Sequence, residues 1–275
     1  MSQSVNKKYP MLNLYTLPEV AREGAKPFHY DSEKDLNWPM PCRFGIYGAS
    51  GSRKSLFLCN LLRHLHCITN LYLVAPRLDE KLYKWLMRCH KQLGIKHVFA
   101  MNSLEEFDSL WEEIEKKARP DVMSLVVFDD LLGESDRVPE SVVQLFARGR
   151  KIGLSACFIS SSKSELDSRV RGNIDVEVLK RFNSDDSVMR ILRGAGVGKE
   201  ALSVYKRIVA NPDDAFVIDH SCLERNRPDL KFRHNWAPVQ LGLSYAEPPE
   251  PVVEPPPFVG GSVVRREQPT KHKKK

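Results

Sequence analysis

The segment Arg43-Phe44-Gly45-Ile46-Tyr47-Gly48-Ala49-Ser50-Gly51-Ser52-Arg53-Lys54-Ser55 carries the strongest structural signal in the chain. A short apolar run leads into a glycine turn, and leucines at helical spacing follow Lys54. This order predicts a strand, a phosphate-binding loop and a helix whose N-terminus faces the bound anion. In such a loop Lys54 reaches the outer phosphates and the Ser55 hydroxyl binds Mg²⁺.

One position departs from the pattern G-x-x-x-x-G-K-[ST], because Arg53 stands where the pattern has a glycine. The alternative interpretation is a surface turn rich in Gly and Ser that precedes a helix by chance. The order of strand, loop and helix favours the phosphate loop. The predicted nucleotide-binding residues are therefore Gly48, Ala49, Ser50, Gly51, Ser52, Arg53, Lys54 and Ser55. The sequence leaves open whether Arg53 lies in the place of the phosphates or turns away from it.

A second diagnostic segment is Ser124-Leu125-Val126-Val127-Phe128-Asp129-Asp130. Its continuous apolar run fits a parallel strand that is buried on both faces. The two carboxylates then emerge at the carboxyl end of the strand, where sheets of this class bind their ligands. We expect Asp129 to hold Mg²⁺, directly or through water, and Asp130 to orient an attacking water. The alternative is that both acids cap a following helix.

Composition narrows the class of protein. The chain has 275 residues, of which 42% are hydrophobic, and this is enough for one α/β domain with tails. Lys and Arg (42) exceed Asp and Glu (35), an excess that suits a polyanionic partner. The six cysteines form no C-x-x-C pair, which argues against a zinc or disulfide framework. No signal-peptide pattern and no apolar run of membrane-spanning length is present, so we expect a soluble intracellular protein.

Apolar runs and amphipathic segments alternate along the chain, which predicts a three-layer α/β fold with a mostly parallel central sheet. With the phosphate loop, this is the fold class of RecA/ASCE-like P-loop NTPases. We expect an N-terminal arm at 1–40, an ATPase domain at 41–244 and a Pro-rich, basic, disordered tail at 245–275. The predicted strands are 42–47, 69–75, 96–100, 124–130, 154–159, 174–182 and 215–219, and the predicted helices are 54–66, 79–92, 103–118, 139–150, 184–193 and 198–210.

A third block gives the chain a family resemblance. It runs from Ala147-Arg148-Gly149-Arg150-Lys151 through Leu154-Ser155-Ala156-Cys157-Phe158-Ile159 to Ser160-Ser161-Ser162, and Arg169-Val170-Arg171-Gly172-Asn173 follows. Together with the two segments above, it resembles the genome-packaging ATPases of double-stranded DNA viruses. These form a branch of the FtsK–HerA superfamily that includes the poxvirus packaging ATPase. The resemblance covers roughly residues 25–220.

The resemblance implies further roles. Ser161 stands where the family usually has a sensor glutamine, whose longer side chain touches the γ-phosphate and the catalytic water. In family rings an arginine of one subunit reaches the neighbour's nucleotide, and such a finger speeds phosphoryl transfer by ~10³-fold or more. Arg148 and Arg150 are the favoured candidates, and Arg169 and Arg171 are the others. Arg148–Lys151 and Lys180-Arg181 are candidates for loops that contact DNA phosphates.

The resemblance also implies a function: an ATP- and Mg²⁺-dependent motor, working as a homo-oligomeric ring, that pumps double-stranded DNA into a capsid. Its partners would be DNA and capsid or portal-like vertex proteins. Its place would be the nucleus or virus factory of an infected host, or the virion. The first alternative is a nucleotide- or DNA-binding packaging or scaffold protein with weak or lost hydrolysis, which Arg53 and Ser161 support. A small-molecule P-loop kinase is a weaker alternative.

Overall fold

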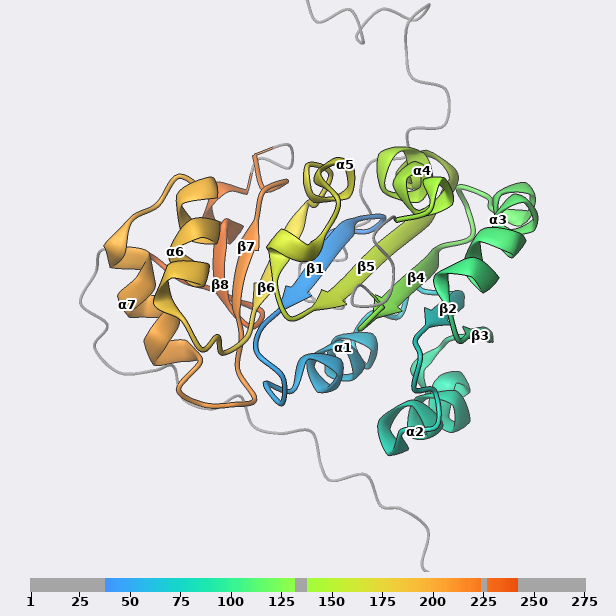
Figure 1. Ribbon diagram of the computed structural model, residues 1–275, viewed down its shortest axis with the longest axis horizontal. Coiled ribbons are helices and arrows are strands. Elements are labelled where there is room, and N and C mark those ends of the chain that lie inside the picture. The colour runs from blue at the N-terminus through green and yellow to red at the C-terminus, as the bar shows by residue number, and fades with distance from the viewer. Residues whose placement is uncertain (1–37, 132–137, 224–226, 242–275) are drawn as a thin grey trace, which may run out of the picture. The chain divides into compact units, whose positions relative to one another are not determined.

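The computed structural model describes residues 38–131, 138–223 and 227–241, and within them a single sheet runs through the domain (Figure 1). The strand order in this sheet is β3-β2-β4-β5-β1-β6-β7-β8-β9. The strands are β1 (Arg43–Tyr47), β2 (Asn70–Val74), β3 (His97–Met101), β4 (Ser124–Asp129), β5 (Leu154–Ser160), β6 (Val176–Leu179), β7 (Phe216–Asp219), β8 (Phe232–His234) and β9 (Ala237–Pro238).

The strands from β3 to β6 in this order pair in parallel, whereas β7, β8 and β9 add an antiparallel extension. The register sets Tyr47 beside Ser160 of β5 and Leu179 of β6. Asp129 lies beside Ile159 on the other side of β5. The carboxyl ends of β4, β5, β1 and β6 therefore meet at one edge of the sheet, which is called the carboxyl edge below.

Helices cover both faces of the sheet and give three layers (Figure 1). The helices α1 (Lys54–Leu62) and α2 (Lys81–Cys89) pack on one face, together with Trp38 and Trp236. The opposite face carries α3 (Leu104–Lys117), α4 (Glu140–Arg148), α5 (Ser168–Arg171), α6 (Asp185–Gly194) and α7 (Lys199–Ile208). Short 3₁₀ turns lie at His90–Leu93, Gly149–Ile152, Lys163–Glu165 and Pro228–Leu230.

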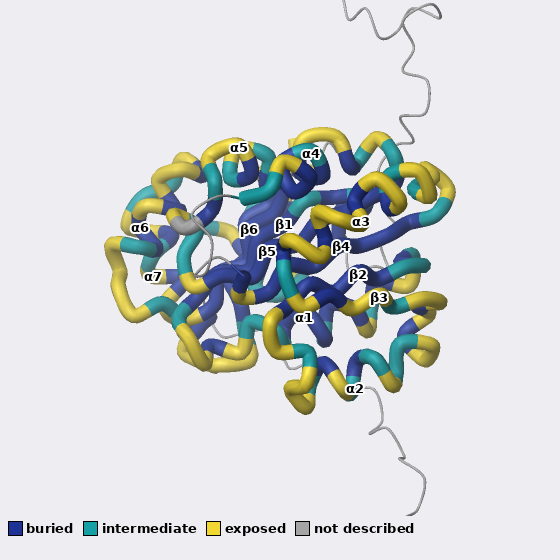
Figure 2. Tube along the Cα trace, turned by 45° about the vertical axis from the view of Figure 1, so that its right-hand side comes forward, coloured by how far each residue is buried: buried dark blue, intermediate teal, exposed yellow. Residues whose placement is uncertain are grey.

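The core lies between these layers. Figure 2 shows the central strands as the buried part of the chain, while the outer sides of the helices and the edge strand β3 are exposed. Every residue of β4 and β5 is buried, as expected for central parallel strands. Trp38 and Met40, at the start of the described chain, are fully buried; the Trp38 ring lies edge-on to Phe44 at 5.5 Å.

The fold class predicted from the sequence is confirmed: a mixed α/β domain with a mostly parallel central sheet. Some elements differ from the prediction. The first helix ends at Leu62 rather than at 66, and the strand predicted at 174–182 is confined to Val176–Leu179. The strands β8 and β9 and the four-residue helix α5 were not predicted. Among the described residues, none of the helices is long and apolar enough to span a bilayer. The predicted tail at 245–275 lies outside the described residues.

Candidate functional site

The loop between β1 and α1 has the backbone shape of an anion cradle. Gly48 adopts φ 156°, and a Cβ added there would lie 2.8 Å from both Cβ of Lys180 and Oγ of Ser52, so this position requires glycine. Gly51 is left-handed as well, with φ 73°. The N–H of Ala49 donates to the Arg181 carbonyl at 2.9 Å, which ties the loop to the end of β6. The N-terminus of α1 follows directly, so its positive dipole end faces this loop.

Lys54 and Ser55 occupy the first turn of α1. The Lys54 ammonium donates to the carbonyls of Gly48 at 2.8 Å and of Ala49 at 3.2 Å, so it lies across the loop. The Ser55 hydroxyl donates to Oδ2 of Asp129 at 2.8 Å, and these two residues are 74 positions apart in the chain. The structure thus brings the predicted loop and the predicted carboxylate into direct contact.

Asp129 also accepts a hydrogen bond from a residue that the sequence did not indicate. The Tyr83 hydroxyl, on α2, donates to the same Oδ2 atom as Ser55. Burial raises the pKa of Asp129, while the hydrogen bonds from Tyr83 and Ser55 and the charge of Lys54 act in the opposite direction. Burial and the neighbouring Asp129 charge also raise the pKa of Tyr83, so Tyr83 is a lasting donor. The amphipathic pattern of the helix predicted at 79–92 marks Tyr83 as a core residue, and no motif distinguishes it.

Asp130 and Ser161 complete this edge of the sheet. Asp130 is exposed, has the left-handed φ of 56°, and donates its N–H to the Ile159 carbonyl at 3.2 Å. The charge of Asp130 contributes to the raised pKa of Asp129, so the two acids interact. Ser161 follows the last residue of β5 and is exposed. Because β5 lies between β4 and β1, Ser161 emerges between the two acids and the glycine loop.

The donor set fits Mg²⁺. Ser55 Oγ and Asp129 supply one hydroxyl and one carboxylate within hydrogen-bond distance of each other. Within residues 38–131, 138–223 and 227–241 no cluster of three or more His, Cys, Asp or Glu side chains could hold a metal by itself. Mg²⁺ usually binds through one or two protein oxygens, with phosphates and waters filling its other positions. The site is therefore suited to a metal that arrives with a phosphorylated ligand.

The side chain of Arg53 pairs with a turn that is distant in the sequence. It adopts the left-handed conformation with φ 63° and ψ 36°, and its NH1 lies 2.5 Å from Oδ1 of Asp213. Asp213 belongs to the turn between α7 and β7, 160 positions away. Lys180 holds the same turn, since its ammonium donates to the carbonyls of Pro212, Asp213 and Asp214 at 2.8–3.0 Å.

Comparison with known proteins identifies the family of the chain. The family model of the poxvirus A32 protein matches residues 27–222. The chain belongs to the poxvirus A32 protein family. This match confirms the resemblance to a poxvirus protein family that the three sequence blocks predicted.

Solved structures similar to this A32-family chain include those of B204. The DNA-packaging ATPase B204 of Sulfolobus turreted icosahedral virus has a TM-score of 0.52 and 12% identity, over 73% of this chain and 98% of that chain. The genome-packaging NTPase B204 of Sulfolobus turreted icosahedral virus 2 in complex with AMPPCP has a TM-score of 0.51 and 12% identity, over 73% of this chain and 99% of that chain. The same protein in complex with sulfate has a TM-score of 0.50 and 13% identity, over 73% of this chain and 98% of that chain. At these identities the likeness concerns the fold. A comparison with the sequences of curated proteins found no match.

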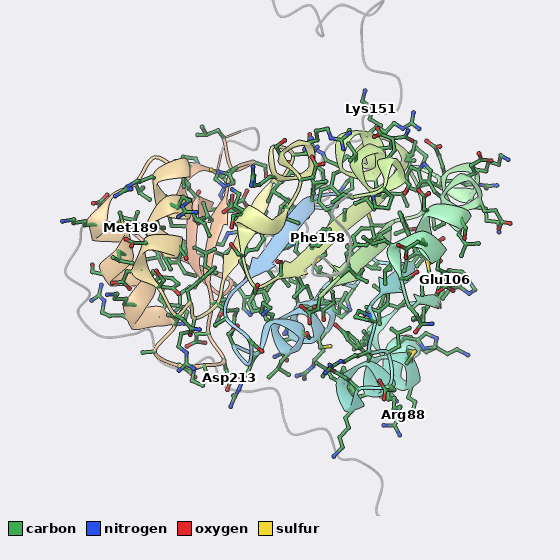
Figure 3. The ribbon with its side chains drawn as sticks, viewed as in Figure 1. Arg88, Glu106, Lys151, Phe158, Met189 and Asp213 are labelled. Carbon is green, nitrogen blue, oxygen red and sulfur yellow. The ribbon has the colours of Figure 1, made fainter. Side chains whose placement is uncertain are left out.

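In this A32-family chain, the two favoured arginines lie away from the phosphate loop. Arg148 ends α4 and Arg150 lies in the turn before β5, so both are at the amino end of that strand. Figure 3 shows Lys151, which follows Arg150 in the chain, at the top of the view, and Asp213, which pairs with Arg53 of the phosphate loop, at the bottom. Arg148 pairs with Glu115 at 2.8 Å and donates to Gln144 at 2.9 Å. The structure does not bring Arg148 or Arg150 to the Lys54–Asp129 site of the same chain.

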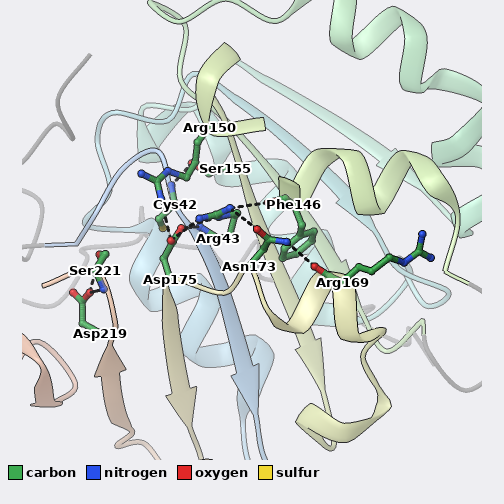
Figure 4. A network of polar contacts seen from close by, with 10 residues as sticks. All are labelled: Cys42, Arg43, Phe146, Arg150, Ser155, Arg169, Asn173, Asp175, Asp219 and Ser221. Carbon is green, nitrogen blue, oxygen red and sulfur yellow. Dashed lines mark hydrogen bonds and ion pairs between the residues drawn. The ribbon is translucent and has the colours of Figure 1, made fainter. Parts of the chain in front are cut away.

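A network of polar contacts holds Arg150 at this amino edge (Figure 4). Asp175, at the start of β6, binds the Arg43 guanidinium through both carboxylate oxygens, at 2.7 and 2.9 Å. Arg150 NH1 lies 3.0 Å from Oδ1 of the same carboxylate. Arg43 NH1 extends the network to the Phe146 carbonyl at 2.8 Å and to Asn173 at 3.2 Å.

The remaining basic candidates have different environments. Lys180, which was a candidate for contacting DNA, is only 1% exposed, so in this conformation its ammonium cannot reach a DNA phosphate, and that expectation is corrected. Arg169 is exposed and pairs with Asp167 and Glu140, each at 3.0 Å. Arg171 donates only to a backbone carbonyl among its described contacts, that of Ser164 at 3.3 Å.

Proposed function

We propose that the chain is an ATPase that translocates double-stranded DNA during viral genome packaging. The observation that carries the proposal is the 2.8 Å hydrogen bond between Ser55 of the loop and Asp129 of β4. This contact joins a phosphate cradle and a metal-binding carboxylate, the two parts that a nucleoside-triphosphate site needs. The likeness of the fold to the DNA-packaging ATPase B204, together with membership of the poxvirus A32 family, supports the packaging role.

The roles follow from the positions of the side chains. The Lys54 ammonium, which now lies on the carbonyls of Gly48 and Ala49, would bind the β- and γ-phosphates in their place. Bound Mg²⁺, held by Ser55 and Asp129, would neutralise charge on the phosphates. Asp130 is exposed beside Asp129, where a carboxylate can orient water. Ser161 would contact the γ-phosphate side from the end of β5.

Hydrolysis in this scheme is completed between subunits. Arg148 and Arg150 lie at the amino edge, so either can reach a nucleotide only in a neighbouring subunit. A homo-oligomeric ring with DNA in its channel provides such a neighbour. We propose capsid or portal-like vertex proteins as further partners, and an intracellular site of action in the infected cell.

The second candidate function is a packaging protein that binds nucleotide and DNA but has weak or lost hydrolysis. It is favoured by Ser161, whose side chain is shorter than the glutamine that the family usually has there. It is favoured also by Asp130, because an Asp extends less far toward a water than a Glu does. At both positions the shorter side chain would slow hydrolysis and leave nucleotide binding intact.

The deciding experiment measures ATP affinity and single-turnover ATP hydrolysis, with Mg²⁺ and with or without duplex DNA. We expect Lys54→Ala to reduce hydrolysis by about 100-fold or more, since a charge that stabilises the transferring phosphoryl group is lost. Lys91→Ala, which removes an exposed lysine in the 3₁₀ turn that follows α2, is the matched control and should retain full activity. Binding without hydrolysis under every condition would select the second candidate. Equal ATP affinity in wild type and Lys54→Ala would contradict both.

A further inference from the structure

A pocket of about 360 Å³ lies on the face of the sheet that carries α5 and α6, between the turn after β5 and the helix α6. Three cationic side chains line it: Lys163 from the turn, Arg171 from the end of α5 and Arg190 from α6. Three hydroxyls line it as well, those of Ser162, Ser164 and Ser187. The pocket does not include any residue of the phosphate loop, and the function proposed above does not use it.

The charge of this pocket is compensated only in part: Lys163 pairs with Glu177, and Arg171 is close enough to Asp167 to lower the pKa of that carboxyl. Among the described residues, no Asp or Glu lines it. Lys163 is balanced from behind by Glu177, a buried carboxylate on β6 that also contacts His220 at 3.1 Å. Although burial opposes ionisation, His220 and Lys163 hold the pKa of Glu177 below its usual value, so this carboxylate stays charged. In the part of the chain that the structure describes, neither Arg171 nor Arg190 forms an ion pair with a carboxylate.

Two of the hydroxyls, those of Ser162 and Ser164, form a hydrogen-bonded pair on the wall of the pocket. Ser162 caps the 3₁₀ turn by accepting the N–H of Ser164 at 3.2 Å, and the two hydroxyl oxygens are 2.6 Å apart. Arg171 NH1 is held near them by its bond to the Ser164 carbonyl at 3.3 Å. Phe182 and Ile191 add an apolar wall. Donors thus approach from the turn, from α5 and from α6.

We propose that this pocket, the Arg171–Arg190 pocket, binds a phosphate group independently of the phosphate loop. Guanidinium groups and hydroxyls are the donors that recognise tetrahedral oxyanions, because each planar guanidinium offers two parallel N–H bonds. A phosphate presents oxygens in three directions and can engage donors on three elements, whereas a carboxylate presents only two oxygens. The volume is at the lower end of the range of small-ligand sites (~300–1000 Å³), so one phosphate and its substituent fill it.

The phosphate could belong to a DNA backbone or to a free phosphorylated molecule, and the test has an arm for each. All variants are made in the Lys54→Ala chain, so that the phosphate loop contributes little. Inorganic phosphate is titrated calorimetrically into Arg171→Gln, Arg190→Gln and the control Arg193→Gln. Arg193 is an exposed residue of α6 that does not line the pocket. Lys163 is left intact, because its removal would strand the buried Glu177 carboxylate.

We expect about tenfold weaker phosphate binding in each pocket variant and no change in Arg193→Gln. In the second arm, duplex DNA affinity is measured against salt concentration. Loss of one phosphate contact lowers the slope of log K against log[salt] by about one. A lower slope in Arg171→Gln and Arg190→Gln, but not in Arg193→Gln, identifies DNA as the source; an unchanged slope with weaker phosphate binding identifies a free ligand.

Two results would overturn the proposal. One is phosphate affinity that is unaffected by both pocket substitutions, and the other is an equal loss in Arg193→Gln, which would indicate a general charge effect. Thermal unfolding of each variant checks the fold, and the exposed position of Arg190 predicts no large shift. Because Lys54 is absent throughout, failure of this proposal is separate from failure of the ATPase proposal.

Discussion

At the residue scale, Asp129 depends on two hydroxyl donors that reach one carboxylate oxygen. Ser55 and Tyr83 both donate to Oδ2 inside a largely buried environment. Without them burial would favour the neutral acid, which cannot hold Mg²⁺. Ser55 is also a proposed metal ligand, so when nucleotide binds, its proton is less available to Asp129. Tyr83 then becomes the main donor that keeps the carboxylate ionised.

The first prediction follows from that dependence. Tyr83→Phe removes a hydrogen bond that lowers the pKa of Asp129, so the pKa should rise further above its usual value. The acid limb of the pH profile of Mg²⁺-dependent ATP binding should then move to higher pH, with little change at alkaline pH. Tyr72→Phe, on the neighbouring β2, makes the same chemical change away from Asp129 and should leave the profile unchanged. Identical profiles for wild type and Tyr83→Phe would contradict this role.

Arg53 raises a separate question at this scale, because a side chain in the left-handed conformation is strained by roughly 1 kcal/mol. Its ion pair with Asp213 is only partly shielded, since the two side chains are 48% and 55% exposed. Such exposed pairs contribute about 0–1 kcal/mol. The strain and the pair therefore nearly cancel, and the pair directs the guanidinium toward Asp213.

The second prediction is that Arg53→Gly changes ATP affinity by less than about threefold and the free energy of unfolding by less than about 1 kcal/mol. Glycine relieves the left-handed backbone while the exposed pair is lost. Asp213→Asn provides the comparison, because it breaks the same pair but keeps the arginine. A tenfold or greater gain in ATP affinity for Arg53→Gly would mean that the guanidinium does compete with the phosphates.

At the scale of elements, the end of β6 connects the phosphate loop to the turn before β7. Lys180 donates its N–H to the Tyr47 carbonyl at 2.8 Å, and its ammonium binds three carbonyls of that turn. The Lys180 carbonyl accepts a hydrogen bond from Tyr205 of α7 at 2.9 Å. One residue therefore joins β1, β6, α7 and the turn.

The third prediction concerns Lys180. Burial lowers its pKa to about 8, although Asp213 and Asp214 act in the opposite direction, whereas a lysine in the unfolded chain titrates near ~10.4. Between these values the unfolded chain binds more protons, so the stability contribution of Lys180 rises with pH. The difference in unfolding free energy between wild type and Lys180→Met should therefore increase from pH 7 to pH 10, on the order of 1 kcal/mol. Denaturant unfolding at several pH values measures it.

The control for this measurement is Lys151→Met, which removes an exposed lysine at the other side of the sheet (Figure 3). Its stability difference should not depend on pH over this interval. A difference for Lys180→Met that stays flat, or that shrinks as pH rises, would show that the lysine is not titrating in the folded protein near pH 8.

The elements also show what the sequence could and could not predict. Long periodic or continuous apolar segments, such as the strand ending in Asp129, were found because local pattern alone determines them. The strands β8 and β9 have three and two residues, too short for any period to register. The contacts of Arg53 with Asp213 and of Tyr83 with Asp129 join residues 160 and 46 positions apart. Chain topology, which no local pattern encodes, brings these pairs together.

At the scale of the whole molecule, the two edges of the sheet carry different chemistry. The carboxyl edge holds Lys54, Ser55 and Asp129, while the amino edge holds Arg150 in the Asp175 network and Arg148 beside Glu115. If Arg148 or Arg150 is the finger, a site whose acids and cradle lie at the other edge is completed only when two copies meet. This arrangement argues for activity that requires an assembly of chains.

The last prediction tests that requirement by mixing two inactive variants. Arg150→Ala retains an intact phosphate loop, and Arg43 still binds Asp175, so the variant should fold. Lys54→Ala retains the arginine but cannot hydrolyse ATP. Arg150→Ala alone should lose about 10³-fold in turnover if Arg150 is the finger, and Lys54→Ala alone should lose about 100-fold or more. In mixtures, interfaces that pair an intact loop with an intact arginine should recover measurable DNA-stimulated hydrolysis. The double variant Lys54→Ala/Arg150→Ala, mixed with either single variant, should recover no hydrolysis, because no interface then has both an intact loop and an intact arginine. The same mixing with Arg148→Ala distinguishes the two candidates, and absence of recovery for both would exclude each as the residue acting in trans.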